Sequence, residues 1–280
     1  MSSTRIIILT TLAMIAFAGN SVLCRAALTD TNIDAASFTA IRLITGALML
    51  CLFVRIQSEA SVGEGNWLSA LALFVYAAGF SFAYLSLPAA TGALLLFGSV
   101  QVTMIGYGLF RGERLARIQV MGLLLALAGL VGLLLPALST PSLFGSIVMT
   151  TAGIAWGVYS LRGSGIIDPI KATAGNFLRA VPMTLILSVV MFEDISFDIA
   201  GFCYAIASGG LASGIGYAIW YTVLPALKTA NAATVQLSVP VIAAFAGIIL
   251  LGEPLSIQFV IASLAIISGI ALVIMQKQNR

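Results

Sequence analysis

Stretches of about 20 apolar residues follow one another along this chain, with only short polar breaks between them. A helix of that length crosses the hydrocarbon core of a bilayer. The pattern predicts ten spanning helices, at 5–27, 34–54, 67–86, 89–110, 114–135, 142–161, 172–191, 199–222, 228–250 and 255–276. Spanning β-strands are about half as long and alternate between apolar and polar residues. We therefore expect an all-α polytopic membrane protein.

The polar breaks differ in charge on the two sides of the predicted membrane. With the N-terminus in the cytoplasm, the cytoplasmic segments hold ten of the thirteen basic residues: Arg5, Arg55, Arg111, Arg114, Arg117, Arg162, Lys171, Lys228, Lys277 and Arg280. The opposite loops hold acids instead, at Asp30, Glu193, Asp194, Asp198 and Glu253. Because cytoplasmic loops of membrane proteins are enriched in Lys and Arg, both termini are predicted to be cytoplasmic.

The two halves of the chain carry matching motifs. The segment 84–88 (Tyr-Leu-Ser-Leu-Pro) precedes Gly112-Glu113, and the segment 221–225 (Tyr-Thr-Val-Leu-Pro) precedes Gly252-Glu253, the second Gly-Glu lying 140 residues after the first. Five spans in each half make the second half enter the membrane from the opposite side. We expect two inverted five-helix repeats, residues 1–138 and 139–280, that form one membrane domain.

Composition excludes several classes of protein. Hydrophobic residues make up 60% of the chain and charged residues 8%, with a mean hydropathy of +1.11, whereas soluble domains average about 25% charged residues. The chain has no histidine, and its three cysteines are widely spaced, so a zinc site or a Ser-His catalytic pair is not expected. We expect neither an enzyme nor a cofactor. The net charge of +3 gives no reason to expect a nucleic-acid partner.

Few charged residues fall at membrane depth. Arg42 and Arg179 lie at matching depths of the two inverted halves. Both can be structural, by snorkelling to the interface or by bonding helix-end carbonyls, and Arg42 has a second interpretation, contact with a substrate carboxylate. No Asp or Glu lies in the middle of a span, where an ion-coupled pump commonly carries an acid, and the first span offers Asn20 instead. This pattern favours a uniporter or an exporter driven by the substrate gradient. Proton coupling through acids at helix ends is the alternative.

Aromatic and amide side chains recur at helical spacing within several spans, which favours a cavity that takes an apolar side chain and offers a few hydrogen bonds. Core packing and an interfacial aromatic belt are the competing interpretations. The candidate substrate-binding residues are Phe17, Asn20, Arg42, Tyr76, Phe80, Ser99, Gln101, Trp156, Tyr159, Ser213, Tyr217 and Gln236. In the spans 89–110 and 228–250 the glutamines point away from the Ser and Thr residues, and the sequence leaves open which face lines the cavity.

Span ends supply candidate gates and caps. Tyr84 and Leu87 are predicted to close the outer mouth of the cavity, and Tyr221 and Leu224 the inner mouth. Glu113 and Glu253 each follow a glycine, so we predict that they cap the following helix through its free amides. Pro240 removes a backbone hydrogen bond and frees the carbonyl of Gln236, so we expect either a bend in its span or a carbonyl that binds substrate.

The paired motifs, the arginine of the second span and the sequences Leu-Gly-Glu-Pro-Leu (251–255) and Phe-Arg-Gly-Glu-Arg-Leu (110–115) resemble the ten-helix, EamA-like branch of the drug/metabolite transporter superfamily. Within that branch the chain is most similar to bacterial amino-acid exporters of the YddG type. The resemblance implies a multi-pass protein of the bacterial inner membrane that exports aromatic and other neutral amino acids by alternating access. A permease for other metabolites or drugs is the alternative, and the chain is expected to be a monomer or a dimer.

Overall fold

The computed structural model describes residues 1–57, 64–87, 89–134, 142–164, 166–251 and 257–275. Its long helices are α1 (Ser3–Asp30), α2 (Ala35–Gln57), α3 (Trp67–Tyr84), α4 (Ala89–Phe110), α5 (Arg117–Leu134), α6 (Leu143–Gly163), α7 (Pro169–Val190), α11 (Ser238–Leu251) and α12 (Ile257–Met275). Shorter elements are η2 (Phe192–Asp194), α8 (Ile199–Ile206), η3 (Ala207–Ile215), α9 (Gly216–Val223), η4 (Leu224–Ala226) and α10 (Thr229–Val235). The described residues contain no strand.

Six of the described helical segments are long enough and apolar enough to cross a membrane, judged by length and composition only. They are Ser3–Asp30, Ala35–Ile56, Trp67–Tyr84, Leu143–Gly163, Pro169–Val190 and Ile199–Ala226. Shorter apolar helices cover Leu95–Phe110, Arg117–Gly132 and Val260–Met275. The predicted apolar stretches therefore fall on helices, and the chain is an all-helical, polytopic membrane protein.

Two of the predicted spans are not uninterrupted α-helices. In the stretch 199–222 the nine residues of η3 form a π-helix between α8 and α9. The stretch 228–250 is divided between α10 and α11. Pro240 accounts for this second break, because it cannot donate to the carbonyl of Gln236, which instead accepts from the N–H of Val239 at 3.1 Å.

Polar residues just before several helices explain where these helices begin. The side chains of Ser2, Asn66, Ser142, Asp168 and Asp198 each accept a hydrogen bond from a backbone N–H three residues later. Such N-caps satisfy amides that have no partner inside the helix. The short polar breaks thus set the helix starts as well as the turns.

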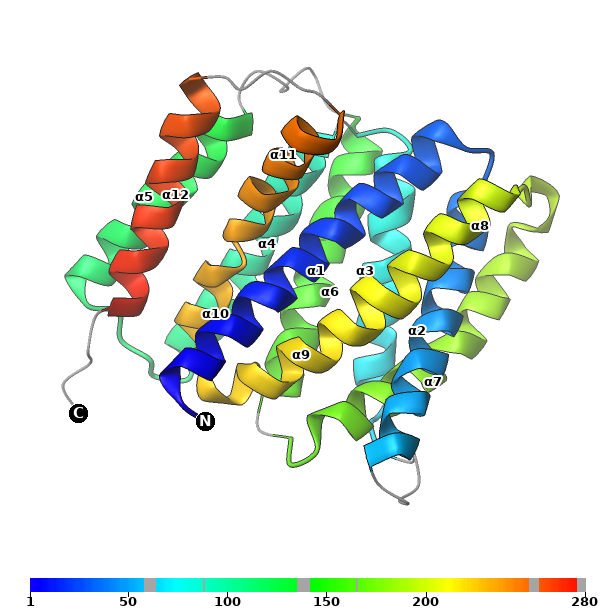
Figure 1. The fold of residues 1–280 in the computed structure, drawn as a ribbon, viewed down its shortest axis with the longest axis horizontal. Coiled ribbons are helices and arrows are strands. Elements are labelled where there is room, and N and C mark those ends of the chain that lie inside the picture. The colour runs from blue at the N-terminus through cyan, green and yellow to red at the C-terminus, as the bar shows by residue number, and fades with distance from the viewer. Residues whose placement is uncertain (58–63, 88, 135–141, 165, 252–256, 276–280) are drawn as a thin grey trace.

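The helices lie roughly side by side in one layered bundle (Figure 1). Elements from the two halves of the chain alternate in it: α3 and α4 pack on α6, α2 packs on α7 and η3, and α1 packs on α9 and α11. The helices α5 and α12 form a pair at one side of the bundle (Figure 1). Glycines bring the backbones of this pair together, since a Cβ at Gly122 would lie 2.7 Å from the carbonyl oxygen of Gly269.

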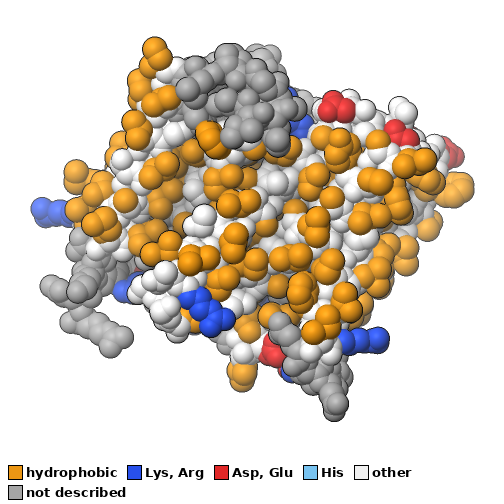
Figure 2. All heavy atoms as spheres, viewed as in Figure 1, with side chains coloured by type: hydrophobic (Ala, Val, Ile, Leu, Met, Phe, Trp, Pro, Cys, Tyr) orange, Lys and Arg blue, Asp and Glu red, His pale blue; other side chains and the backbone are white. Residues whose placement is uncertain are grey.

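We call the end of the bundle where α1 begins and α9 ends the lower end, and the end where α1 ends and α8 begins the upper end (Figure 1). The view in Figure 2 shows an apolar surface between these ends, with acidic side chains mainly at the upper right but also at the lower edge, and basic ones mainly along the lower edge and the left side. Long apolar side chains such as Leu124 and Ile186 are exposed in the described part of the chain. An apolar belt between two charged ends is the surface that a bilayer requires.

Backbone and carboxylate hydrogen bonds join two loops at the upper end. The N–H of Asp34 donates to the carbonyl of Ser196 at 2.9 Å, and the N–H of Ser196 donates to the Asp34 carboxylate at 2.9 Å. The carboxylate of Asp198 accepts from the N–H groups of Gly201 at 2.7 Å and Asn32 at 3.2 Å. We call these contacts of residues 32–34 with residues 196–198 the upper latch. It connects the α1–α2 loop to the start of α8.

The upper latch gives a prediction about pH. Hydrogen bonds from Gly201 and Asn32 hold the pKa of Asp198 below its usual value, which is about 3.9. A lowered folded-state pKa contributes stability above the unfolded-state value, and this contribution is lost as pH falls through the folded-state value. We expect Asp198→Asn, which keeps the cap but carries no charge, to lower the thermal unfolding midpoint at pH 7. The difference from the wild type should vanish as the pH falls below about 4. A difference independent of pH contradicts this role of the carboxylate.

Candidate functional site

Aromatic side chains from four helices meet in the middle of the bundle. Phe17 of α1 packs edge-on against Trp156 of α6 and Tyr217 of α9, with ring centroids 5.3 and 5.6 Å apart. Trp156 also lies 4.9 Å from the ring of Tyr76 of α3 and 5.0 Å from that of Tyr217. We call these rings, with Phe80 and Tyr159, the aromatic cluster. The cluster brings together aromatic residues that the sequence placed on separate spans. Its rings pack against one another between the helices.

Arg42 of α2 lies next to this cluster and is fully buried, with 1% of its surface exposed. Its Nε donates to the hydroxyl of Ser213 at 3.1 Å, and its Nη2 donates to the hydroxyls of Tyr76 and Tyr217, each at 3.4 Å. The guanidinium carbon also lies 5.4 Å from the centre of the Tyr76 ring, within cation–π range. Residues from both halves of the chain therefore surround this charge.

The guanidinium of Arg42 is incompletely satisfied by the part of the chain that the structure describes. Its Nη1 has no hydrogen-bond partner there, and none of the described carboxylates forms an ion pair with it. Arginine stays protonated in proteins, and a buried charge is costly unless it is paired. The arrangement is therefore suited to bind an anionic group at Nη1, beside aromatic rings that favour an apolar or aromatic neighbour.

The π-helix η3 positions the partner of Arg42. Gly209 in η3 packs directly on the backbone of α2, where a Cβ would overlap the carbonyl oxygen of Arg42 and the hydroxyl of Thr45. This close approach places Ser213, one turn later, at the guanidinium. Ser208 of the same segment donates to the Oδ1 of Asn20 in α1 at 2.6 Å. π-helical turns are frequent at functional sites.

The two glutamines of the paired spans face the interior between α4, α6 and α10. The Oε1 of Gln236 accepts from the indole N–H of Trp156 at 2.6 Å, and its Nε2 donates to the carbonyl of Ala232 at 3.0 Å. The Nε2 of Gln101 donates to the carbonyl of Ala233 at 2.6 Å. The sequence left open which face of these two spans is directed to the interior. In the structure the glutamine faces are directed to it: Gln236 orients Trp156, and Gln101 joins α4 to α10.

The bond between Gln236 and Trp156 can be tested by a double-mutant cycle. Gln236→Leu leaves the buried indole N–H unpaired, which costs about 1–3 kcal/mol, whereas Trp156→Phe removes donor and indole together. We expect the two substitutions to couple by about 1 kcal/mol in the free energy of unfolding. The measurement is reversible unfolding of the purified variants in mixed micelles. Additive effects mean that the bond contributes nothing to stability.

Ser99 takes part in the packing of α4 on α6. Its hydroxyl donates to the carbonyl of Leu95 at 2.7 Å, and its Cβ lies where a side chain at Gly153 of α6 would be. The structure thus places Ser99 in the packing contact between α4 and α6. Arg179, which the sequence paired with Arg42, donates from Nη1 to the carbonyls of Glu64 and Gly175, each at 2.9 Å. The two arginines therefore have different surroundings.

The candidate gating residues lie at opposite ends of the aromatic cluster. Tyr84 packs edge-on against Phe80 with centroids 4.8 Å apart, and Leu87 is buried against Gly145 at the start of α6. Tyr221 packs against Tyr159 at 5.3 Å and is fully buried. Leu224, also buried, follows at the end of α9.

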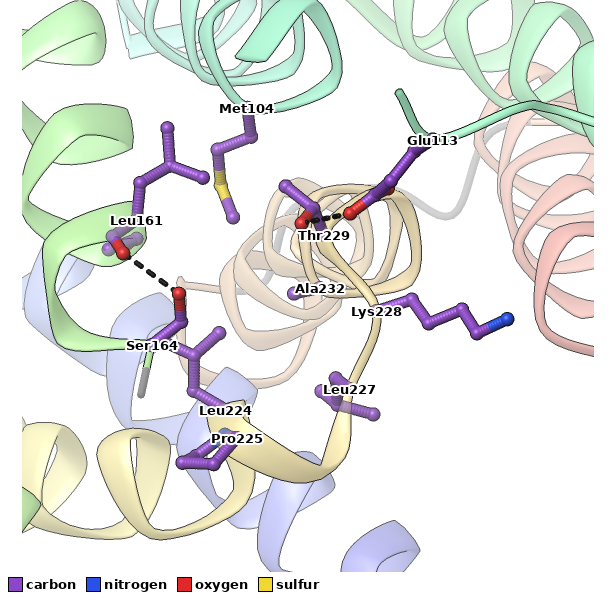
Figure 3. A pocket seen from close by; sticks show the side chains of 11 residues that line it. Met104, Glu113, Leu161, Ser164, Leu224, Pro225, Leu227, Lys228, Thr229 and Ala232 are labelled. Atoms are coloured by element: carbon purple, nitrogen blue, oxygen red, sulfur yellow. Dashed lines mark hydrogen bonds between the residues drawn. The ribbon is translucent and has the colours of Figure 1, made fainter. Parts of the chain in front are cut away.

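A pocket of about 320 Å³ opens at the lower end, below Tyr221 and Leu224. We call it the lower pocket (Figure 3). It lies between the end of α4, the end of α6, η4 and α10, and its lining residues are Met104, Glu113, Ser160, Leu161, Ser164, Leu224, Pro225, Leu227, Lys228, Thr229 and Ala232. Pockets for small molecules measure about 300–1,000 Å³, so this one has room for a small ligand.

Most residues of the lower pocket were not predicted from the sequence to belong to a site. Apart from Glu113 and Leu224, its lining comes from helix ends and the α9–α10 connection, where no motif pointed to a ligand. The carboxylate of Glu113 accepts from the hydroxyl of Thr229 at 2.6 Å, while the first free amide before α5, that of Ala116, donates to the side chain of Gln119 at 3.0 Å. Glu113 thus bridges to α10. Glu253, the matching cap, lies outside the described residues.

These features define a multi-pass membrane protein with a buried, incompletely hydrogen-bonded arginine between elements of its two halves. A family model of EamA-like transporters matches residues 4–135 and again residues 143–275. The chain therefore belongs to the EamA-like transporter family, within the drug/metabolite transporter superfamily. This is a family of transporters and not of enzymes.

Relatives from distant organisms are similar along most of their length. An uncharacterized protein of Pseudomonas aeruginosa is 53% identical and aligns with 100% of this chain and 98% of its own. The uncharacterized transporter YoaV of Bacillus subtilis is 24% identical over 83% of this chain and 85% of its own. An uncharacterized transporter of Archaeoglobus fulgidus is 25% identical over 95% and 96%. A solved crystal structure superposes with a TM-score of 0.82 over 99% of this chain and 100% of its own, at 17% identity, a likeness that shows the fold alone.

Proposed function

We propose that this protein is a secondary transporter of the bacterial inner membrane that exports aromatic and other neutral amino acids. One observation carries the substrate class: the buried Nη1 of Arg42 has no partner among the described residues and lies beside the aromatic cluster. An α-carboxylate supplies the missing anion, and planar guanidinium groups bind carboxylates in a bidentate manner. An aromatic or other apolar side chain then packs against Phe17, Tyr76 and Trp156 when these rings, which are in mutual contact in the structure, move apart.

In this proposal the chain forms ten spans as two inverted five-helix repeats, residues 1–138 and 139–280, with both termini in the cytoplasm. Two observations support the duplication: the family model matches twice, once in each half, and elements of the two halves alternate in the bundle. The basic residues near the lower end support its assignment to the cytoplasm. A ligand site between inverted repeats is a recurrent arrangement in secondary transporters.

Two features support alternating access: the place where the structure is open and the places where its helices are interrupted. The lower pocket opens at the proposed cytoplasmic end, while the upper latch joins loops at the other end. The π-helix η3 and the break between α10 and α11 are the points where helices can bend with little loss of hydrogen bonding. We propose that Tyr221 and Leu224 close the inner path when Tyr84 and Leu87 open the outer one.

The proposed energy source is the substrate gradient itself. All Asp and Glu residues that the structure describes lie at helix ends or in loops, such as Asp34, Glu113 and Asp168. A proton- or ion-coupled pump commonly carries an acid inside a span. Uniport is therefore the proposed mode, and a ΔpH dependence of transport counts against it.

Counterflow in proteoliposomes tests the proposal. Vesicles loaded with unlabelled phenylalanine or tryptophan are expected to accumulate the labelled amino acid, with the same rate in the presence and absence of a pH gradient. Vesicles loaded with a sugar phosphate serve as the negative control, because phosphorylated substrates call for clustered cations that the site lacks. Absence of counterflow for every neutral amino acid, with counterflow for another solute class, contradicts the substrate assignment.

A further inference from the structure

The lower pocket has two chemically different walls. One wall is apolar and includes Met104, Leu161 and Leu224; the other carries the carboxylate of Glu113 and the hydroxyl of Thr229 (Figure 3). Methionine adapts its shape to different apolar groups. In Figure 3 the side chain of Lys228 runs away from the apolar wall. A ligand in this pocket therefore meets an anionic group and an apolar surface at the same time.

The carboxylate of Glu113 is held in place by the turn that carries it. Gly112 adopts a positive φ of 90°, a conformation that glycine takes at little cost, and the N–H of Glu113 donates to the carbonyl of Gly108 at 2.9 Å. The carboxylate folds back over Gly108, where a Cβ would lie only 2.8 Å from its Oε2. Its Oε1 accepts from the hydroxyl of Thr229. Glycine at 108 thus makes room for the acid.

The carboxylate retains acceptor capacity for a ligand. An ionised carboxylate has about four lone-pair sites, and the hydroxyl of Thr229 occupies one of them. The C-terminal end of α6, which carries Leu161 and Ser164, borders the same pocket, and the carbonyls at a helix C-terminus favour a positive charge. The described residues include no group of three His, Cys, Asp or Glu side chains that could hold a metal ion. An organic cation fits this wall better than a metal.

We propose that the lower pocket is a first binding site for the substrate, in which Glu113 binds a primary ammonium group and the apolar wall takes the side chain. The inference extends the proposed amino-acid transport, since a free amino acid carries both the ammonium group and the carboxylate. Leu224 lines this pocket and follows Tyr221, which packs on Tyr159 of the aromatic cluster. The ammonium group is thus bound first at Glu113, and the carboxylate afterwards at Arg42.

Three ligands that share one ring separate the two charged groups. Phenethylamine has only the ammonium group, 3-phenylpropionate has only the carboxylate, and phenylalanine has both. Binding is measured by titration calorimetry on the full-length protein in lipid nanodiscs. For Glu113→Gln we expect phenethylamine affinity to fall about tenfold or more, as for a lost charge-assisted hydrogen bond. The affinity for 3-phenylpropionate should stay unchanged.

Two further variants make the test specific. Glu64→Gln is the matched control, because Glu64 is exposed at the same end of the bundle and lies outside the pocket; it should bind all three ligands as the wild type does. Gly108→Ala keeps the acid but displaces it, so it should weaken phenethylamine binding without affecting 3-phenylpropionate. If Glu113→Gln fails to fold, the phenethylamine affinity of Gly108→Ala still tests the ammonium site.

The outcomes distinguish this inference from the proposed function. If phenethylamine binding is insensitive to both Glu113→Gln and Gly108→Ala, the ammonium site is wrong, even where phenylalanine counterflow succeeds. Equal weakening of the amine and the acid also overturns it, because that result reports a general disturbance of the pocket. If counterflow of amino acids fails while amine binding depends on Glu113, the pocket assignment stands and the amino-acid exporter assignment falls.

Discussion

Replacing Arg42 by lysine is expected to reduce phenylalanine counterflow about 30-fold or more. Truncating or altering one partner of a buried charged hydrogen-bond pair costs about 2–5 kcal/mol, and 2 kcal/mol corresponds to about 30-fold in affinity. A lysine ammonium is a single point charge and cannot contact Ser213, Tyr217 and a bidentate carboxylate together. Buried lysine also loses its proton readily, whereas arginine does not.

The same substitution separates the two interpretations of Arg42. If the guanidinium binds the substrate carboxylate, Arg42→Lys raises the half-saturation constant for phenylalanine, in addition to any fall of the thermal unfolding midpoint from the lost contacts with Ser213 and Tyr217. If Arg42 only holds α2 to α9, the midpoint falls and the transport of every substrate decreases in parallel. Arg111→Lys is the matched control, because Arg111 is exposed at the lower end of α4 and outside the lower pocket. Unchanged phenylalanine transport in Arg42→Lys rejects the carboxylate contact.

Gly209→Ala, which adds one methyl group, is expected to reduce counterflow by displacing Ser213 from Arg42. The Cβ of Gly209→Ala would overlap the Arg42 carbonyl and the Thr45 hydroxyl, so α2 and η3 must separate. Overpacking of this kind costs about 1–3 kcal/mol of stability. The separation also moves Ser213 away from the guanidinium, and we expect counterflow to fall about tenfold or more, since about 1.4 kcal/mol corresponds to that factor.

The neighbouring glycine provides the control for this prediction. Gly210 is also buried in η3, but the nearest atom to its Cβ would be the terminal methyl carbon of Met49 at 3.6 Å, an ordinary van der Waals distance. Gly210→Ala should therefore keep wild-type transport and thermal midpoint. If both alanine variants behave alike, helix propensity rather than the contact with α2 explains the result. Transport at the wild-type rate in Gly209→Ala contradicts the close-approach argument.

The lower pocket shows why part of the site was beyond prediction. Glu113 was interpreted as a cap from its position after Gly112, and that position is local information. Its partner Thr229 lies 116 residues later, and no spacing rule connects residues so far apart when no fold is given. The role of Gly108 depends in the same way on a carboxylate folding back over it.

The sequence by itself determined the class of protein, the positions of the apolar helices and the enrichment of basic residues at one end. It did so because a bilayer offers the backbone no hydrogen-bond partners, so any long apolar stretch must satisfy its amides within its own helix. Aromatic stripes could also be recognised, since residues four apart share a helix face.

Only the tertiary structure decided which faces meet. Each span is apolar nearly all round, and such a helix has no hydrophobic face that orients it toward its neighbours. Packing of small residues sets the rotation instead: Gly209 brings η3 onto α2 and so gives Arg42 its contact with Ser213. The bond from Trp156 to Gln236 and the lower pocket arise from the same kind of long-range contact.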